Sequence, residues 1–208
     1  MASKITVLCD PGHGGKINGI YQTAGKRSPK FDDGSVLYEG VNNRDNVNRL
    51  VHVLEKEGIK AIDIVNSDSD VALSERVRRA NLLSKGGECM YISMHSDAHG
   101  NGAEWTPASG ISVYTSEGQT KSDEFAQIVI DRLQANFGET VKWRTDKSDG
   151  DEDHEENFYV LKKTNCPAIL IEAGFHTNKK EALRMLSEEW KNKLTQSIVE
   201  AIKIWEEK

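Results

Sequence analysis

Four side chains in the sequence could together bind a metal ion and use it: His13, Glu39, His95 and Glu172. His13 and His95 each follow an apolar run that predicts a buried strand. Glu172 follows the apolar run 168–171, where an ionised side chain needs a partner or a chemical role. Two imidazoles and one carboxylate, with a fourth position open for water, are a common ligand set for catalytic zinc. We therefore identify these residues as candidates for a zinc site, with Glu172 as an acid or base beside it.

The residues alone leave other interpretations open. The three candidate ligands are far apart in the sequence, and such wide separations carry no specificity, unlike two histidines on one helical turn. Glu39 also lies at the start of a predicted helix, where the helix dipole favours a carboxylate in any case. Asp10, close to His13, could orient a ligand imidazole or cap the following turn. A zinc hydrolase is thus one hypothesis that the residue types support.

The elements that must position these side chains alternate between strands and helices. Apolar runs at 5–8, 90–94 and 168–171 predict three strands that end at the candidate site. Apolar residues at helical spacing predict helices that begin near Glu39 and in 73–83, with Asp70 or Ser74 as caps. Two more apolar stripes at helical spacing follow, at 125–133 and 194–205. This alternation predicts an α/β fold, in which ligands gather at the carboxyl ends of the strands.

Three segments between these elements carry expectations of their own. Residues 16–38 are polar and aperiodic, which predicts a long loop that forms a binding surface. We name five candidate substrate contacts in this loop: Tyr21, Arg27, Phe31, Asp32 and Tyr38. Alternating apolar residues in 111–115 predict a half-buried strand. The acidic run 149–156 predicts a solvated loop, with metal binding by His154 as the less favoured alternative.

Length and composition set the class of protein. With 208 residues, 37% hydrophobic and 29% charged, the chain is expected to form one globular domain over residues 1–208. A net charge of −6 gives no basic footprint for nucleic acid. No segment approaches the roughly 20 apolar residues that cross a bilayer, so membrane insertion is not expected. The three cysteines, Cys9, Cys89 and Cys166, are odd in number and widely separated, which favours reduced thiols.

Several segments taken together resemble a known family. They are LCDPGHGG, Glu39 followed by Asn43, DVALSERVRRAN from Asp70, ISMHSDA from Ile92, and FYVLKKTNCPAILIEAGFHTN from Phe158. In this order, and over nearly the whole chain, they closely resemble the catalytic domain of zinc-dependent N-acetylmuramoyl-L-alanine amidases. The chain departs from the pattern at Asn66 and Ser67, where Thr-Arg is frequent, and at Asp97, where Asn is common.

The resemblance implies a twisted, mostly parallel mixed sheet of about six strands with helices on both faces. It implies Zn²⁺ ligated by His13, Glu39 and His95, and a catalytic Glu172. The implied reaction is hydrolysis of the amide bond between the lactyl group of N-acetylmuramic acid and the L-alanine of the stem peptide. Peptidoglycan or a muropeptide is then the partner, and we expect a monomer.

The ends of the sequence add an expectation about biological context. We see no signal peptide and no appended wall-binding repeats, so we expect a phage or prophage endolysin that is made in the cytoplasm and acts on the wall after release. Two alternatives remain. One is a zinc metallopeptidase that cuts within the stem peptide, and the other is a non-catalytic wall-binding module.

Overall fold

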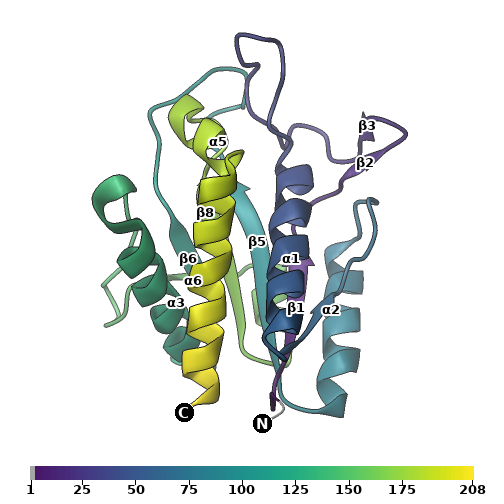
Figure 1. The fold of residues 1–208 in the computed structure, drawn as a ribbon, viewed down its shortest axis with the longest axis vertical. Coiled ribbons are helices and arrows are strands. Elements are labelled where there is room, and N and C mark those ends of the chain that lie inside the picture. Colours follow the sequence, from purple (N-terminus) through teal and green to yellow (C-terminus); the bar gives the residue numbers. More distant parts are fainter. Residues whose placement is uncertain (1–2) are drawn as a thin grey trace.

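Six strands form the central sheet of the structure, a computed structural model that describes residues 3–208 (Figure 1). The strands are β1 (Thr6–Pro11), β4 (Lys60–Asp63), β5 (Cys89–Asp97), β6 (Ser112–Thr115), β7 (His154–Glu155) and β8 (Ala168–Phe175). Their order is β4-β1-β5-β8-β6-β7. Neighbouring strands are parallel except β6 and β8, which are antiparallel. The prediction of an α/β fold with a mostly parallel, mixed sheet is confirmed.

Helices cover both faces of this sheet. One face carries α1 (Glu39–Lys56), α3 (Lys121–Phe137), α5 (Lys179–Met185) and α6 (Glu188–Glu206). The opposite face carries α2 (Leu73–Leu83) and α4 (Tyr159–Lys163). In Figure 1, α1 and α6 lie side by side in front of the strands. Short 3-10 turns follow α2 and α3, at Ser84–Gly86 and Gly138–Thr140.

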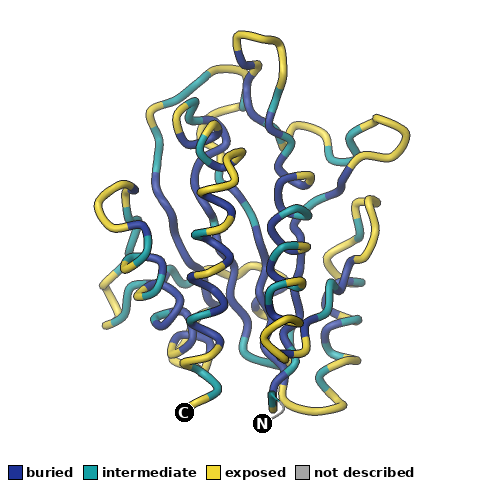
Figure 2. Tube along the Cα trace, in the orientation of Figure 1, coloured by how far each residue is buried: buried dark blue, intermediate teal, exposed yellow. Residues whose placement is uncertain are grey.

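The core consists of two hydrophobic clusters, one on each side of the sheet. Val7 and Cys9 of β1 belong to the cluster under α1 and α6, whereas Leu8 between them belongs to the cluster under α2 and α4. Successive side chains of a strand point to opposite faces, so Glu172 lies on the same face as Leu170, the side of α2 and α4. Figure 2 shows the strands buried between the exposed outer surfaces of the helices.

Most helix boundaries agree with the predictions. Helix α1 begins at Glu39, and its C-terminal end is followed by Gly58 with φ of 77°, the left-handed conformation that favours glycine. The predicted caps of α2 are wrong, because Ala72 precedes the helix and no side chain caps it. Asp70 instead accepts a hydrogen bond from Thr23 Oγ1 at 2.7 Å.

Three segments differ from expectation. The predicted loop 16–38 contains a small hairpin, β2 (Lys16–Ile17) with β3 (Ile20–Tyr21). The strand predicted at 111–115 is confirmed as β6, but it is not half-buried, since all four of its residues are buried between neighbouring strands and by packing on both faces. The acidic segment 149–156 includes β7, which adds an edge strand to the sheet beside β6.

The cysteines are free thiols, as predicted. Cys9 and Cys89 are buried, and Cys166 is half-buried. Burial raises the pKa of all three thiols, that of Cys166 to about 12. They are therefore poor nucleophiles near neutral pH.

None of the helices described for residues 3–208 combines the length and apolar composition needed to cross a bilayer.

Candidate metal centre

The three candidate metal ligands, which come from three separate elements, meet at the carboxyl ends of the strands. His13 lies in the turn after β1, His95 lies in β5, and Glu39 is the first residue of α1. Glu39 Oε1 is 3.2 Å from His13 Nε2 and 3.1 Å from His95 Nδ1. One ligand atom of each residue lies within 4.8 Å of the other two. The structure thus brings together the residues proposed from the sequence.

This arrangement fits a zinc ion. Tetrahedral zinc with bonds of about 2.0–2.1 Å spaces its ligand atoms roughly 3.3 Å apart, close to the two distances from Glu39 Oε1. Glu39 is only 1% exposed, and its Oε2 has no hydrogen-bond partner. Burial alone would raise the pKa of Glu39, but hydrogen bonds with His13 and His95 hold it well below its usual range. A buried carboxylate with a free oxygen is costly without a cation, so this donor set suits a metal.

The glycines around His13 are needed for close packing. A Cβ atom at Gly12 would lie 2.2 Å from His95 Cε1, so only glycine leaves room for this ring. A Cβ atom at Gly40 would lie 2.0 Å from the carbonyl oxygen of Gly14, so α1 can approach the turn only without a side chain there. His13 itself has φ of 64°, which few residues other than glycine adopt.

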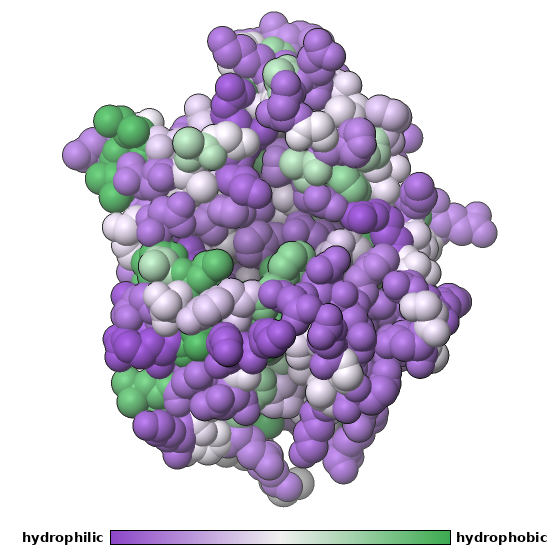
Figure 3. All heavy atoms as spheres, turned by 180° about the vertical axis from the view of Figure 1, so that it is seen from behind, coloured by the Kyte–Doolittle hydropathy of each residue, from purple (hydrophilic) through white to green (hydrophobic). Residues whose placement is uncertain are grey.

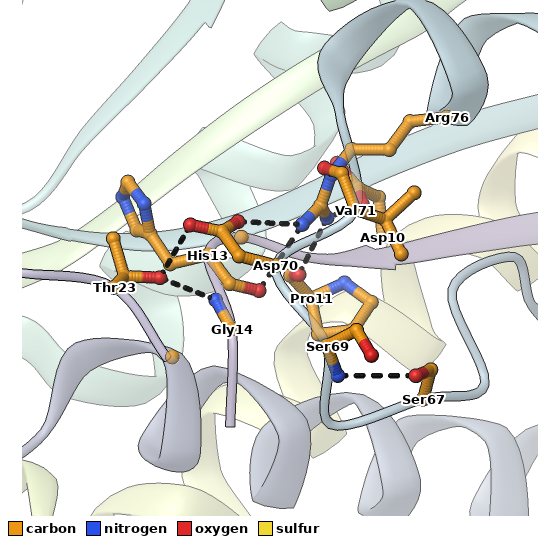
Figure 4. A network of polar contacts seen from close by, with 12 residues as sticks. Asp10, Pro11, His13, Gly14, Thr23, Ser67, Ser69, Asp70, Val71 and Arg76 are labelled. Carbon is orange, nitrogen blue, oxygen red and sulfur yellow. Dashed lines mark hydrogen bonds and ion pairs between the residues drawn. The ribbon is translucent and has the colours of Figure 1, made fainter. Parts of the chain in front are cut away.

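Two arginines hold the backbone of this turn. Arg76 Nη2 donates a hydrogen bond to the carbonyl oxygen of His13 at 3.1 Å, and Arg76 Nη1 donates to that of Pro11 at 2.7 Å (Figure 4). Arg44 Nη1 donates to the same His13 oxygen at 2.8 Å. The left-handed backbone of His13 is therefore fixed by bonds from α1 and α2.

Asp10 has a role that differs from both roles expected of it. It is 1% exposed and forms an ion pair with Arg76. The hydroxyls of Tyr91 and Ser93 donate to its Oδ2 at 2.7 and 2.8 Å. Within residues 3–208, Asp10 has no hydrogen bond to an imidazole. Its carboxylate instead balances the buried charge of Arg76.

Glu172 lies opposite His95 in the pairing of β5 with β8, and both line a cavity of about 620 Å³. Glu172 Oε2 is buried without a hydrogen-bond partner. Burial raises the pKa of Glu172 to about 8, because the charge of His95 offsets the burial only in part. The cavity also has apolar lining from α2, α4 and β8 and the residues just before the two helices: Val71, Ala72, Leu73, Phe158, Val160 and Leu170. Figure 3 shows this side of the molecule, with apolar patches beside hydrophilic surface.

His176 is a site residue that the sequence reasoning missed. It is 1% exposed, and its Nδ1 lies 3.0 Å from both oxygens of Ser96 and 3.9 Å from Glu39 Oε2. Burial lowers its pKa, which favours the neutral ring. The backbone nitrogen of Ser96 also donates to Glu39 Oε1 at 3.3 Å. The sequence contains a signal for this role, because His176 directly follows the strand that carries Glu172.

The candidate substrate contacts in the 16–38 loop do not line this cavity, and their role stays a prediction. None of the five is among the residues that line the cavity: Tyr21, Arg27, Phe31, Asp32 and Tyr38. Tyr21 packs on Tyr38 with ring centroids 4.7 Å apart, and Asp32 forms an ion pair with Lys179 at 2.8 Å. Lys26 is the residue of this loop that reaches the cavity.

The positions that depart from the amidase pattern make protein contacts. Asp97 Oδ2 forms an ion pair with Arg144 Nη1 at 2.5 Å. The carbonyl oxygen of Ser67 accepts a hydrogen bond from Arg44 Nε at 2.9 Å, which joins this position to the arginine that holds His13. Asn66 adopts φ of 41°.

Comparisons with known proteins show which family the chain resembles. The family model described as N-acetylmuramoyl-L-alanine amidase matches residues 7–204. The solved N-acetylmuramoyl-L-alanine amidase from Clostridium difficile 630 is 28% identical, with a TM-score of 0.78 over 98% of this chain and 97% of that chain. Amidase AmiC2 of Nostoc punctiforme is 26% identical, with a TM-score of 0.76 over 100% of both chains.

A curated relative, the probable cell wall amidase LytH of Staphylococcus saprophyticus, is 28% identical over 200 residues. The match covers 96% of this chain but only 58% of that protein, so the chain spans less than two thirds of this relative. The family match, in contrast, extends over nearly all of the chain. The chain belongs to the N-acetylmuramoyl-L-alanine amidase family.

Proposed function

We propose that this chain is a zinc-dependent hydrolase that cleaves the amide bond between N-acetylmuramic acid and L-alanine in peptidoglycan. One observation carries the proposal: His13 and His95 both contact the same buried oxygen of Glu39, at 3.2 and 3.1 Å, on a cavity that Glu172 also lines. Family membership supports the choice of bond.

His13, Glu39 and His95 would hold the zinc ion. When bound, the ion supplies a Lewis acid for the substrate carbonyl and a positive charge that lowers the pKa of water and of the nearby Glu172. The backbone nitrogen of Ser96 donates to Glu39 Oε1 at 3.3 Å and so helps to position this carboxylate, and His176 Nδ1 lies 3.0 Å from the oxygens of the same serine. The arginines that bind the His13 carbonyl hold the backbone of this residue and so help to keep its ring beside Glu39.

Glu172 would act as the general base and acid of the reaction. As a carboxylate it would accept a proton from the attacking water. As a carboxylic acid it would then deliver that proton to the amide nitrogen, which leaves as the free amino group of L-alanine. A positioned group of this kind typically contributes 10²–10⁴-fold to the rate.

The rest of the cavity supplies binding. Leu73 is 54% exposed and Phe158 37% exposed at its edge, so apolar parts of a substrate can reach them from solvent. Tyr159, 43% exposed, lies beside them at the start of α4. Lys26 adds a positive charge to a wall that is otherwise rich in histidine and carboxylate. This mixture suits a ligand with methyl groups, hydroxyls and a carboxylate.

Mass spectrometry of fragments released from purified peptidoglycan tests the proposal. The protein is incubated with the wall as purified, after chelation, and after zinc is added back. We expect stem peptides that begin with a free L-alanine, released only when metal is present. Release that is unaffected by a chelator would contradict the role of the metal.

The same measurement separates the alternatives that the sequence left open. New amino groups inside the stem peptide, with the lactyl–alanine bond intact, would identify a metallopeptidase. Binding to several wall types without any released fragment would identify a wall-binding module. Either result would overturn the amidase proposal.

The biological context stays a prediction. It is a phage or prophage endolysin that forms one catalytic domain over residues 1–208 and works as a monomer. Its test is the loss of turbidity of intact and of membrane-permeabilised bacteria after the protein is added. Light scattering coupled to size-exclusion chromatography measures the oligomeric state.

A further inference from the structure

A second group of metal-binding side chains lies away from the candidate metal centre. Asp123, Asp151 and Asp153 each place one carboxylate oxygen within 4.8 Å of the other two. Asp123 belongs to the first turn of α3, and the other two lie in the loop that leads to β7. Strand β6 runs antiparallel to β8, and its first residue, Ser112, pairs with Glu172. Its last residue, Thr115, therefore lies toward the opposite end of the sheet from Glu172.

Two of the three aspartates are buried, Asp151 is half-buried, and the group lacks a compensating positive charge. Asp153 is 1% exposed and Asp123 is 3% exposed. Over residues 3–208, none of the three carboxylates has an ion pair with a basic side chain. Two basic residues of the adjacent segment pair elsewhere, Arg144 with Asp97 and Lys147 with Glu152. Buried carboxylates in proteins are normally paired with a cation or bound to a metal.

Two oxygens of the group have no hydrogen-bond partner. Asp153 Oδ2 accepts a hydrogen bond from Thr115 Oγ1 at 2.6 Å, whereas Asp153 Oδ1 is buried and unpaired. Asp151 Oδ1 is also buried and unpaired. Asp153 is therefore more than nine-tenths buried, has a free oxygen and faces two further carboxylates. A carboxylate in this setting needs a partner that accepts an electron pair, such as a cation.

The remaining oxygens are fixed in place by other bonds. Asp123 Oδ2 accepts from the backbone nitrogen and the hydroxyl of Thr120, at 2.6 and 2.8 Å, in the capping box of α3. Asp123 Oδ1 lies 3.1 Å from Thr115 Oγ1 and shares its single proton with Asp153 Oδ2. Burial and the neighbouring Asp151 and Asp123 raise the pKa of Asp153 to about 7. The carboxylates are therefore held together at a cost, which a bound cation would offset.

We propose that Asp123, Asp151 and Asp153 bind one Ca²⁺ ion. The donors are all oxygens, which hard cations prefer, and neighbouring water would complete the six to eight ligands of calcium. His154 is not part of the group, because its ring stacks on Tyr114 and its Nε2 lies 3.2 Å from the carbonyl oxygen of Arg144. The ion would join the start of α3 to the acidic loop and so stabilise this end of the sheet.

Thermal unfolding of the zinc-loaded protein tests the proposal. Contaminating calcium is removed with a chelating resin, zinc content is verified, and CaCl₂ is added to a few millimolar at constant ionic strength. We expect the melting temperature to rise by about 5 °C or more, since an ion that binds only the folded state stabilises it. Equal concentrations of MgCl₂ should give less than half of this shift. Equilibrium dialysis should find one Ca²⁺ per chain in addition to zinc.

Asp153→Asn should abolish the calcium shift while the protein still folds, because an asparagine oxygen can still accept from Thr115. Asp151→Asn should weaken calcium binding at least 10-fold. Asp146→Asn, at the start of the same loop and outside the group, is the control and should keep the full shift. The proposal is overturned if calcium does not shift the wild-type protein, if Asp153→Asn responds equally, or if magnesium gives the same shift. Because the readout is stability, these results are independent of whether the chain cleaves peptidoglycan.

Discussion

The imidazole of His95 lies against the α-carbon of Gly12, so closely that a methyl group there would be 2.2 Å from His95 Cε1. The contact explains the first glycine of the turn. It also joins the position of His95, one candidate metal ligand, to the backbone of the turn that carries another, His13.

Gly12→Ala should therefore displace the His95 ring and lower metal binding. We expect zinc per chain to fall below one half and hydrolysis to fall at least 10-fold, measured by elemental analysis and by release of stem peptides. Gly86→Ala is the matched control, because no atom lies within 4 Å of the position of its Cβ. Full zinc content in Gly12→Ala would show that the ring can move without losing the ion.

The buried pair of Arg76 and Asp10 should be important for stability. Both side chains are 2% exposed. Arg76→Met leaves the Asp10 carboxylate unpaired, and removing one partner of a buried pair typically costs about 3–5 kcal/mol. Urea unfolding of the metal-free protein should show this loss.

Asp10→Asn in the Arg76→Met background provides the control for that prediction. If the cost arises from the unpaired carboxylate, the double variant should be more stable than Arg76→Met by about 1 kcal/mol or more. Strict additivity of the two single changes would show that the residues act independently.

The strands and helices that carry the candidate metal ligands could be predicted, since each shows a clear apolar pattern. The run before Glu172 identified β8, and the spacing of Val47, Leu50 and Leu54 identified α1. The meeting of His13 with His95 then followed from parallel strands that end at one edge. Hydrophobic periodicity determines such elements because it specifies which face is buried.

The polar network behind the site could not be predicted in this manner. Arg76 has the spacing of the buried face of α2, between Leu73 and Ala80, and its partner Asp10 is 66 residues away. The same holds for the aspartates of the second group, since a run of acidic residues usually indicates a solvated loop. Pairing between distant polar side chains depends on the tertiary fold, which periodicity does not encode.

The ion pair between α1 and α6 should make stability depend on pH. Asp45 Oδ2 is 2.6 Å from Lys191 Nζ, and Asp45 Oδ1 is 3.0 Å from Arg49 Nε. Burial would raise the pKa of Asp45, but hydrogen bonds from Lys191 and Arg49 lower it below its ordinary 3.8. Because the folded-state pKa lies below the unfolded value, the stabilisation is present above pH 3.8 and is lost as the pH falls through the folded value.

Asp45→Asn should consequently lower the free energy of unfolding at pH 7 by about 0.5–1 kcal/mol, the range for a partly exposed pair. The difference from wild type should shrink as the pH is lowered below 3.8. Urea unfolding at pH 7 and at pH 3 measures both quantities. Asp131→Asn, an exposed residue without an ion pair in the described part of the chain, should have little effect at either pH.

Zinc content measured together with turnover separates the proposed ligand role of His95 from the proposed acid–base role of Glu172. Glu172→Gln should keep one zinc per chain, as determined by inductively coupled plasma mass spectrometry, while release of stem peptides falls about 100-fold or more. His95→Ala should lose both zinc and turnover. Retained turnover in Glu172→Gln, or full zinc occupancy in His95→Ala, would contradict the account.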